Sequence, residues 1–138
     1  MATTSIVDRL KARVGVPAPA ISAPVEAGHL KRFVDAIGDP NPRWLNQAPP
    51  TFLVALVPVS MHLPEAEEYG KGWLNGGNRF EHMEPVMVGD RITATGRVVD
   101  VYEKTGSSGP MLFIIFETEY VNQRGRTVAR VRGTAIRR

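Results

Sequence analysis

Residues 50–63 read Pro-Thr-Phe-Leu-Val-Ala-Leu-Val-Pro-Val-Ser-Met-His-Leu, the most apolar stretch of the chain. Proline at position 50 fits the first turn of a helix, and the side chains after it are apolar all round. In a globular protein this pattern predicts a buried helix over residues 50–63, although Pro58 must kink it or end it early. Four of its side chains are expected to be inaccessible to solvent: Phe52, Leu53, Leu56 and Val57. A helix this apolar needs other elements to wrap around it.

The second half of the chain supplies strands that can do so. Apolar and polar side chains alternate along it, and turn-forming residues separate the runs. The phase of the alternation shifts after Val98, which indicates a β-bulge. A buried helix followed by an antiparallel meander predicts an α+β fold, a single domain in which an antiparallel sheet curls around a central hydrophobic helix. The expected strands cover residues 78–86, 91–102, 111–121 and 127–136, with a loop over residues 105–110.

Two shorter helices are expected before the central one. Ser5 can cap a helix that runs to residue 14, after which prolines turn the chain into an extended arm. Apolar residues three and four apart predict a second helix over residues 27–37, with Gly38 as its C-cap. The expected division of the chain is a helix and arm over residues 1–19 and one domain over residues 20–138.

The composition excludes several classes of protein. The chain has 138 residues, of which 43% are hydrophobic and 22% charged, as is typical of one folded domain. It has no cysteine, which excludes a disulfide framework, a thiolate metal site and a cysteine nucleophile. The longest apolar run is too short and too rich in proline to span a bilayer, and the N-terminus lacks the pattern of a signal peptide. We therefore expect a cytoplasmic protein with no membrane association and no metal.

The chain is basic, with 17 Lys and Arg against 14 Asp and Glu. Arginines gather in residues 124–138, where no acidic residue occurs, and on a strand Arg130 and Arg132 would share one face. They form either the solvated face of a terminal strand or a site for ligand phosphates, because guanidinium groups match phosphate geometry. A nucleic-acid surface fits less well, since no aromatic residues alternate with these arginines to stack on bases. We therefore expect no nucleic-acid partner.

Four segments of the chain occur together in a known family. They are residues 33–42 (FVDAIGDPNP), 48–52 (APPTF), 80–90 (FEHMEPVMVGD) and 121–125 (VNQRG). In this order they resemble the MaoC-like hydratases and dehydratases, most closely the N-terminal, fatty-acid-synthase-type dehydratase branch. The resemblance covers about residues 20–138. It implies the hot dog fold, in which a curled antiparallel sheet surrounds one long helix and pairs side by side with a second copy.

The resemblance also implies a chemistry, and this chain lacks one residue of it. Active family members carry Gly-Asp-x-Asn-Pro-x-His, in which the aspartate and histidine activate the water that adds to an enoyl thioester. The corresponding residues here are Asp39, Asn41, Pro42, Arg43 at the variable position and Trp44 in place of histidine. An indole N–H donates a hydrogen bond but cannot accept a proton, so the base is missing. Asp39, Asn41 and Trp44 are therefore the remnant of a catalytic site.

The histidines of the chain do not replace this base. The spacing of His29, His62 and His82 supports no pairing with Asp39, so each is expected to be a surface or core histidine. Asp39 also has a structural alternative, because Asp-Pro-Asn-Pro is a turn sequence in which the carboxylate caps backbone amides. Without its histidine, the capping role is the one we expect for Asp39.

A second departure from the family concerns the substrate tunnel. Family members carry a further helical segment between the Asp-x-Asn-Pro motif and the motif that begins at Ala48. In this chain only residues 44–47 separate Pro42-Arg43 from Ala48. The missing segment and the kink at Pro58 imply room for a bulky acyl group. Mycobacterial-type steroid side-chain degradation uses heteromeric hydratases with such a pocket, and this chain resembles their non-catalytic half. The alternative is a loop deletion without consequence, because loops tolerate changes of length.

Three functions follow from these observations. The first is a subunit of a heteromeric (R)-specific 2-enoyl-CoA hydratase or 3-hydroxyacyl dehydratase, which forms a tunnel for a bulky acyl-CoA thioester while its partner supplies the aspartate and histidine. The second is a homodimeric acyl-CoA or polyketide binding protein without turnover. The third is a stand-alone hydratase that uses Asp39 with His82 as base. No cofactor is implied beyond the CoA of the substrate.

The same observations give candidate site residues. We expect Trp44 near the remnant site at a subunit interface, where a large aromatic side chain can pack and still donate its N–H. The candidate substrate-binding residues are Pro50, Thr51, Phe52, Arg130 and Arg132.

Overall fold

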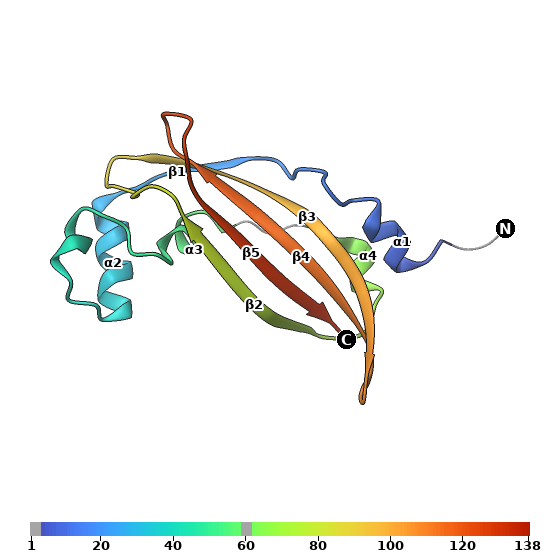
Figure 1. Cartoon of the computed structure of the whole chain (residues 1–138). Coiled ribbons are helices and arrows are strands. Elements are labelled where there is room, and N and C mark those ends of the chain that lie inside the picture. The colour runs from blue at the N-terminus through green and yellow to red at the C-terminus, as the bar shows by residue number, and fades with distance from the viewer. Residues whose placement is uncertain (1–3, 59–61) are drawn as a thin grey trace.

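The computed structural model of the chain describes residues 4–58 and 62–138 and is shown in Figure 1. Its strands form one antiparallel sheet, which confirms the expected α+β class. Its helices are short, and in the described part of the chain none is long and apolar enough to cross a bilayer. In chain order the elements are α1 (Ile6–Lys11), β1 (Ile21–Pro24), α2 (Ala27–Ile37), the 3-10 helix η1 (Pro42–Leu45), α3 (Phe52–Leu56), α4 (Pro64–Glu67), β2 (Trp73–His82), β3 (Arg91–Gly106), β4 (Gly109–Val121) and β5 (Thr127–Arg137).

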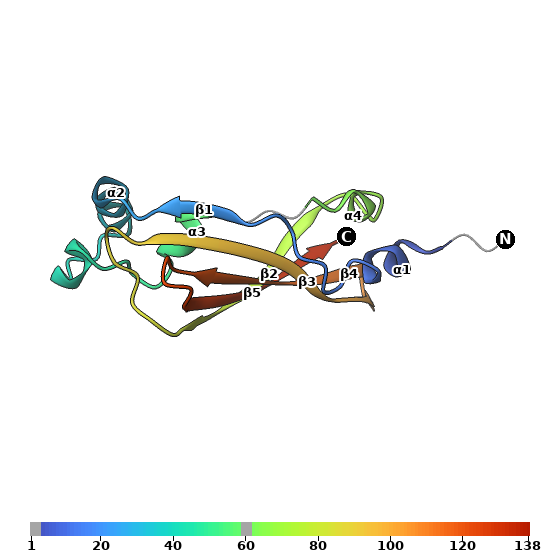
Figure 2. The same cartoon turned by 90° about the horizontal axis from the view of Figure 1, so that it is seen from above.

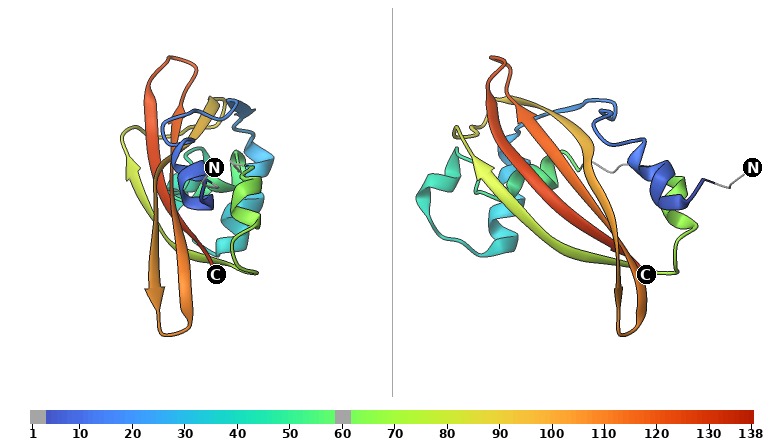
Figure 3. Two further views of the ribbon diagram at one scale, coloured as in Figure 1. Left: turned by 90° about the vertical axis from the view of Figure 1, so that its right-hand side faces the viewer. Right: turned by 45° about the vertical axis from the view of Figure 1, so that its right-hand side comes forward.

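The sheet is curled, and helices cover one of its faces. Its strand order is β1-β3-β4-β5-β2, so that β1 and β2 form its two edges. Figures 2 and 3 show α2, α3 and α4 on the same side of the sheet, with α2 and α3 towards one end and α4 towards the other. One cluster of buried side chains surrounds α3, and a second includes residues of α1 and α4. The expected sheet curled around a hydrophobic helix is therefore confirmed.

The central helix is much shorter than the apolar run predicts. α3 ends at Leu56, and Val57 leaves helical geometry with φ −131° and ψ 81°, one residue before Pro58. Proline disfavours the helical conformation in the residue that precedes it, which explains where the helix breaks. The predicted helix over residues 50–63 is therefore wrong in its extent, and residues 59–61 lie outside the described part of the chain. The four side chains expected to be inaccessible are all buried: Phe52, Leu53, Leu56 and Val57.

Shortening Leu56 tests whether this small helix carries the core. Leu56 is 8% exposed and packs in the cluster around α3. Leu56→Ala is expected to lower the free energy of unfolding by about 2–5 kcal/mol, because it removes buried methyl groups and leaves a cavity. Urea unfolding followed by circular dichroism measures the loss. Val54→Ala, at an exposed position of the same helix, is the matched control, and a near-neutral Leu56→Ala would show that the helix is peripheral.

The alternation predicted for β3 and β4 is confirmed, but both strands are longer than expected. β3 runs to Gly106 and β4 starts at Gly109, so the expected loop over residues 105–110 is a tight hairpin turn instead. The register between the two strands shifts between Val98 and Asp100. This shift is the bulge that the change of phase in the sequence predicts.

Other elements differ from the prediction at their ends. α2 has the predicted bounds and ends in Gly38, whose φ of 69° is the left-handed C-cap conformation. α1 stops at Lys11 rather than at residue 14. β2 begins at Trp73 rather than at residue 78 and ends at His82. β1 was not predicted, because a four-residue edge strand that contains proline leaves little alternation to detect.

A buried arginine ties the last strand to the segment around α4. Arg137 near the end of β5 is 6% exposed, and its guanidinium lies 5.1 Å from the centre of the Trp73 ring. It donates hydrogen bonds to the backbone carbonyls of Ala66, Glu67, Tyr69 and Gly70. These acceptors bind the donors on Nε and Nη2, and the Glu67 carboxylate lies 3.3 Å from Nη2, so the burial of the cation is compensated.

Candidate functional site

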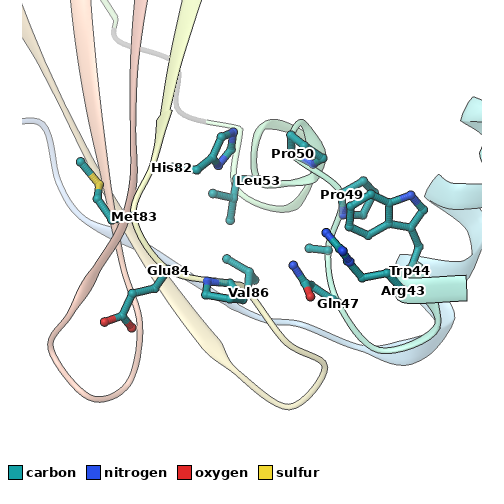
Figure 4. A pocket seen from close by; sticks show the side chains of 12 residues that line it. Arg43, Trp44, Gln47, Pro49, Pro50, Leu53, His82, Met83, Glu84 and Val86 are labelled. Carbon is teal, nitrogen blue, oxygen red and sulfur yellow. The ribbon is translucent and has the colours of Figure 1, made fainter. Parts of the chain in front are cut away.

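A pocket opens between η1, the start of α3 and the end of β2. It encloses about 340 Å³, and its lining is mostly apolar. Figure 4 shows Leu53 of α3 and His82 of β2 on one side of the pocket and the side chains of η1 on the other. The pocket is therefore lined by two of the four motif segments, residues 48–52 and 80–90, and by Arg43 and Trp44, which directly follow the first segment.

The Asp-Pro-Asn-Pro segment beside the pocket folds back on itself. The backbone N–H of Asn41 donates to Oδ1 of Asp39 at 3.0 Å, and the backbone N–H of Arg43 donates to Oδ1 of Asn41 at 3.0 Å. Asn41 thereby caps η1, which begins at Pro42. The Trp44 side chain and the Asn41 amide hold the pKa of the Asp39 carboxyl below its ordinary value. The Asp39 carboxylate therefore caps a backbone amide, as expected for a chain without the family histidine.

Trp44 stands between this pocket and a second hollow. The second hollow encloses about 460 Å³ and is lined by residues of α2 and by Asp39. The indole Nε1 of Trp44 is buried and has no well-formed hydrogen bond in the described part of the chain, although the side chain is near enough to lower the pKa of Asp39. The structure thus brings Asp39, Asn41 and Trp44 together. Because an indole cannot accept a proton, Trp44 cannot take over the role of the family histidine as base.

The three histidines of the chain have different surroundings. His29 packs its ring against the core, and His62 is exposed. His82 lines the pocket and stacks on Phe80, with ring centroids 6.0 Å apart. Asp39 lines the second hollow, so His82 and Asp39 do not face the same cavity.

The three expected binding residues at the start of α3 have different surroundings. Pro50 lines the pocket, and Thr51 is exposed at the N-cap of the helix. Phe52 is fully buried in the core, where its ring meets Phe33 and His29 edge to face at centroid distances of 5.3 and 5.1 Å. Phe52 therefore belongs to the core and does not line the pocket.

Arg130 and Arg132 lie on the outer face of β5, because their neighbours Ala129 and Val131 point into the core. Each pairs with a glutamate directly opposite on β4. The terminal nitrogen of Arg132 lies 2.7 Å from the Glu117 carboxylate, and Nε of Arg130 lies 3.4 Å from the Glu119 carboxylate. They therefore share one face, as predicted, but not the face that carries the pocket.

Phosphate binding by these two arginines stays a prediction, and their ion pairs lower the expected effect. The double substitution Arg130→Ala with Arg132→Ala is expected to weaken binding of a CoA ester by less than about tenfold, because the glutamates already neutralise both cations. Titration with a CoA ester at low and moderate salt measures the change. A larger loss at low salt would show that phosphates displace the glutamates.

Residues 12–131 match the family described as FAS1-like, dehydratase domain region. The chain belongs to this family. Among curated relatives, a UPF0336 protein of Streptomyces avermitilis is 26% identical over 102 residues, which cover 61% of this chain and 68% of that protein. A UPF0336 protein of Parafrankia sp. is 31% identical over 112 residues, which cover 61% of this chain and 74% of that protein.

Solved structures show that this FAS1-like dehydratase-region protein has the hot dog fold expected from its motifs. The ChsH1-ChsH2 complex of Mycobacterium tuberculosis contains a chain with a TM-score of 0.79 and 17% identity, covering 96% of this chain and 88% of that one. The HadBC (3R-hydroxyacyl-ACP dehydratase) complex of the same organism contains a chain with a TM-score of 0.72 and 20% identity, and the match covers 90% of this chain and 96% of that one. A MaoC-like dehydratase of Rhodospirillum rubrum has a TM-score of 0.67 and 23% identity, and the match covers 91% of this chain and 93% of that one. The resemblance to MaoC-like proteins is thereby confirmed.

The sequence did not predict that Arg43 of this FAS1-like dehydratase-region protein lines the pocket. Its one signal in the sequence was its place inside the family motif, between Pro42 and the substituted Trp44.

Among the described residues, no group of histidine, aspartate and glutamate side chains is suited to hold a metal ion.

Proposed function

We propose that this chain is the non-catalytic subunit of a heteromeric (R)-specific 2-enoyl-CoA hydratase or 3-hydroxyacyl dehydratase. One observation carries the proposal: the chain keeps Asp39, Asn41 and Pro42 of the family motif in a hydrogen-bonded turn, while Trp44 stands where the motif has its histidine. A catalytic partner chain would then supply the aspartate and histidine that activate water, and this chain would form part of the substrate tunnel.

Two further observations support a partner chain. The solved structures of similar fold include two complexes of different chains, ChsH1-ChsH2 and HadBC. In this chain, β2 is a ten-residue edge strand with no further strand beside it in the described residues. Its free backbone N–H and C=O groups suit pairing with a second sheet.

The short central helix supports a bulky acyl group as substrate. α3 has only five residues, whereas the family resemblance implies one long helix inside the sheet. A shorter helix occupies less of the volume that the sheet encloses. We therefore propose an acyl-CoA thioester of steroid side-chain type as the substrate of the assembly.

Mixing this chain with its partner tests the proposal. The partner to use is a MaoC-like chain with an intact Asp-x-Asn-Pro-x-His motif, encoded beside this one. We expect each chain alone to hydrate crotonyl-CoA and a bulkier enoyl-CoA poorly, and the co-purified mixture to be active, with the larger gain for the bulkier substrate. Robust hydration of crotonyl-CoA by this chain alone would contradict a non-catalytic role.

The pocket favours a second candidate, a homodimeric acyl-CoA or polyketide binding protein without turnover. The described residues of this chain form a largely apolar cavity of about 340 Å³, which supports binding of an acyl group. Tight binding of an acyl-CoA, together with an inactive mixture, would favour this alternative.

A further inference from the structure

The pocket beside η1 holds a positive charge that no acid in the described residues neutralises. Arg43 lines the pocket, and it forms no ion pair with any carboxylate of residues 4–58 and 62–138. Figure 4 shows its side chain reaching from η1 towards the middle of the pocket, beside Gln47. The guanidinium therefore keeps its donors available at the pocket.

The acidic residue of the lining does not offset this charge. Glu84 points away from the middle of the pocket in Figure 4, and its carboxylate lies 3.2 Å from Nη1 of Arg126. Arg43 thus differs from Arg130 and Arg132, which stand on the outer face of the sheet with a glutamate each.

Most of the remaining wall of the pocket is apolar. Its floor and sides include Pro49, Pro50, Leu53 and Val86, together with the indole ring of Trp44. Apolar walls with a few convergent polar groups are typical of small-molecule sites, and a volume of about 340 Å³ lies within their usual range. A guanidinium at such a wall selects ligands that combine an apolar body with a negatively charged oxygen group.

We propose that this pocket binds an acyl compound through its apolar chain and that Arg43 binds the anionic group of that compound. The anionic group is a carboxylate in a free acid or a phosphate in a thioester carrier, and both accept paired hydrogen bonds from a guanidinium. Gln47 stands beside it as a neutral donor for a carbonyl oxygen. The inference deepens the proposed function by assigning a specificity residue, and it rests on that function only for the choice of acyl compounds.

Titration of the full chain with three eight-carbon ligands tests the assignment. They are octanoate, octanoyl-CoA and the neutral octanoyl thioester of N-acetylcysteamine. Arg43→Ala is expected to weaken binding of at least one anionic ligand by about tenfold or more and to change binding of the neutral thioester by about twofold at most. Loss for octanoate identifies a carboxylate site, and loss for octanoyl-CoA alone identifies a phosphate site.

Two further variants make the result specific to this guanidinium. Arg43→Lys keeps the charge but not the paired donors, so it is expected to retain part of the affinity. Arg32→Ala removes an exposed arginine of α2 that lines no part of the pocket, and it is expected to bind all three ligands like the parent chain. Four results would each overturn the proposal. Arg32→Ala could lose as much affinity as Arg43→Ala, or Arg43→Ala could lose as much affinity for the neutral thioester as for the anionic ligands. Arg43→Ala could also bind every ligand like the parent chain, or the parent chain could bind no anionic ligand at all. These titrations need neither partner nor turnover, so their outcome is separate from that of the mixing experiment.

Discussion

Trp44→His is expected to give the chain hydratase activity of its own. The substitution restores the proton acceptor of the family motif beside an aspartate that is still in place. A positioned general base contributes about 10²–10⁴-fold to a rate, so hydration of crotonyl-CoA is expected to rise above the parent chain by a factor in that range. Loss of the enoyl absorbance measures the rate.

The pH dependence of the gained activity identifies its origin. A histidine base works as the neutral imidazole, so the rate is expected to rise with pH through about 6.5. In the parent chain the Trp44 side chain lowers the pKa of Asp39, and the variant loses this contact, but an aspartate with an ordinary pKa is also charged over this range. Trp44→Phe provides no base and is the control, as is Trp44→His combined with Asp39→Asn. If Trp44→His gains nothing over Trp44→Phe, the surroundings of Asp39 have also lost the catalytic geometry.

Arg137→Met is expected to lower the free energy of unfolding by about 3–5 kcal/mol. Removing one partner of a buried charged contact leaves the other groups without compensation. Here the groups left behind are backbone carbonyls around α4, which receive all four of the side-chain hydrogen bonds of Arg137. Methionine fills much of the volume but donates nothing, so the loss reports the polar contacts of Arg137, which include an ion pair with Glu67 at 3.3 Å, rather than a cavity. Urea unfolding of the full chain measures it.

Arg132→Met on the same strand is the matched control for this prediction. Its guanidinium is paired with Glu117 on the exposed face, and exposed ion pairs contribute about 0–1 kcal/mol. A loss below about 1 kcal/mol for Arg137→Met would show that water satisfies the freed carbonyls.

The sequence predicted β3, β4 and β5 better than it predicted α3, for a physical reason. Alternation along β3, β4 and β5 reflects which side chains face the core, so even the bulge between Val98 and Asp100 is visible as a change of phase. The end of α3 is different. An apolar run has no amphipathic face that marks its limits, and Pro58 alone allowed either a kink or a stop.

At the candidate site, local geometry was predictable and long-range geometry was not. The turn at Asp39 depends on hydrogen bonds within a few residues, which the Asp-Pro-Asn-Pro sequence favours by itself. Whether Phe52 would face the core or a ligand depends on how α3 sits against the sheet. The position of Arg43 in a pocket that includes residues of β2 likewise depends on the tertiary fold.

The free edge of β2 also affects how readily newly made chains aggregate while they fold. An unpaired edge strand is a template on which other unfolded or partly folded chains can aggregate. β2 carries two protections against this: a register shift between Asn75 and Gly77, and the exposed charges of Arg79 and Glu81. Both disturb the regular ladder that an added strand needs. A chain made without a partner is therefore guarded against aggregation at this edge, and the same features restrict pairing to a partner whose strand accommodates the bulge and the charges.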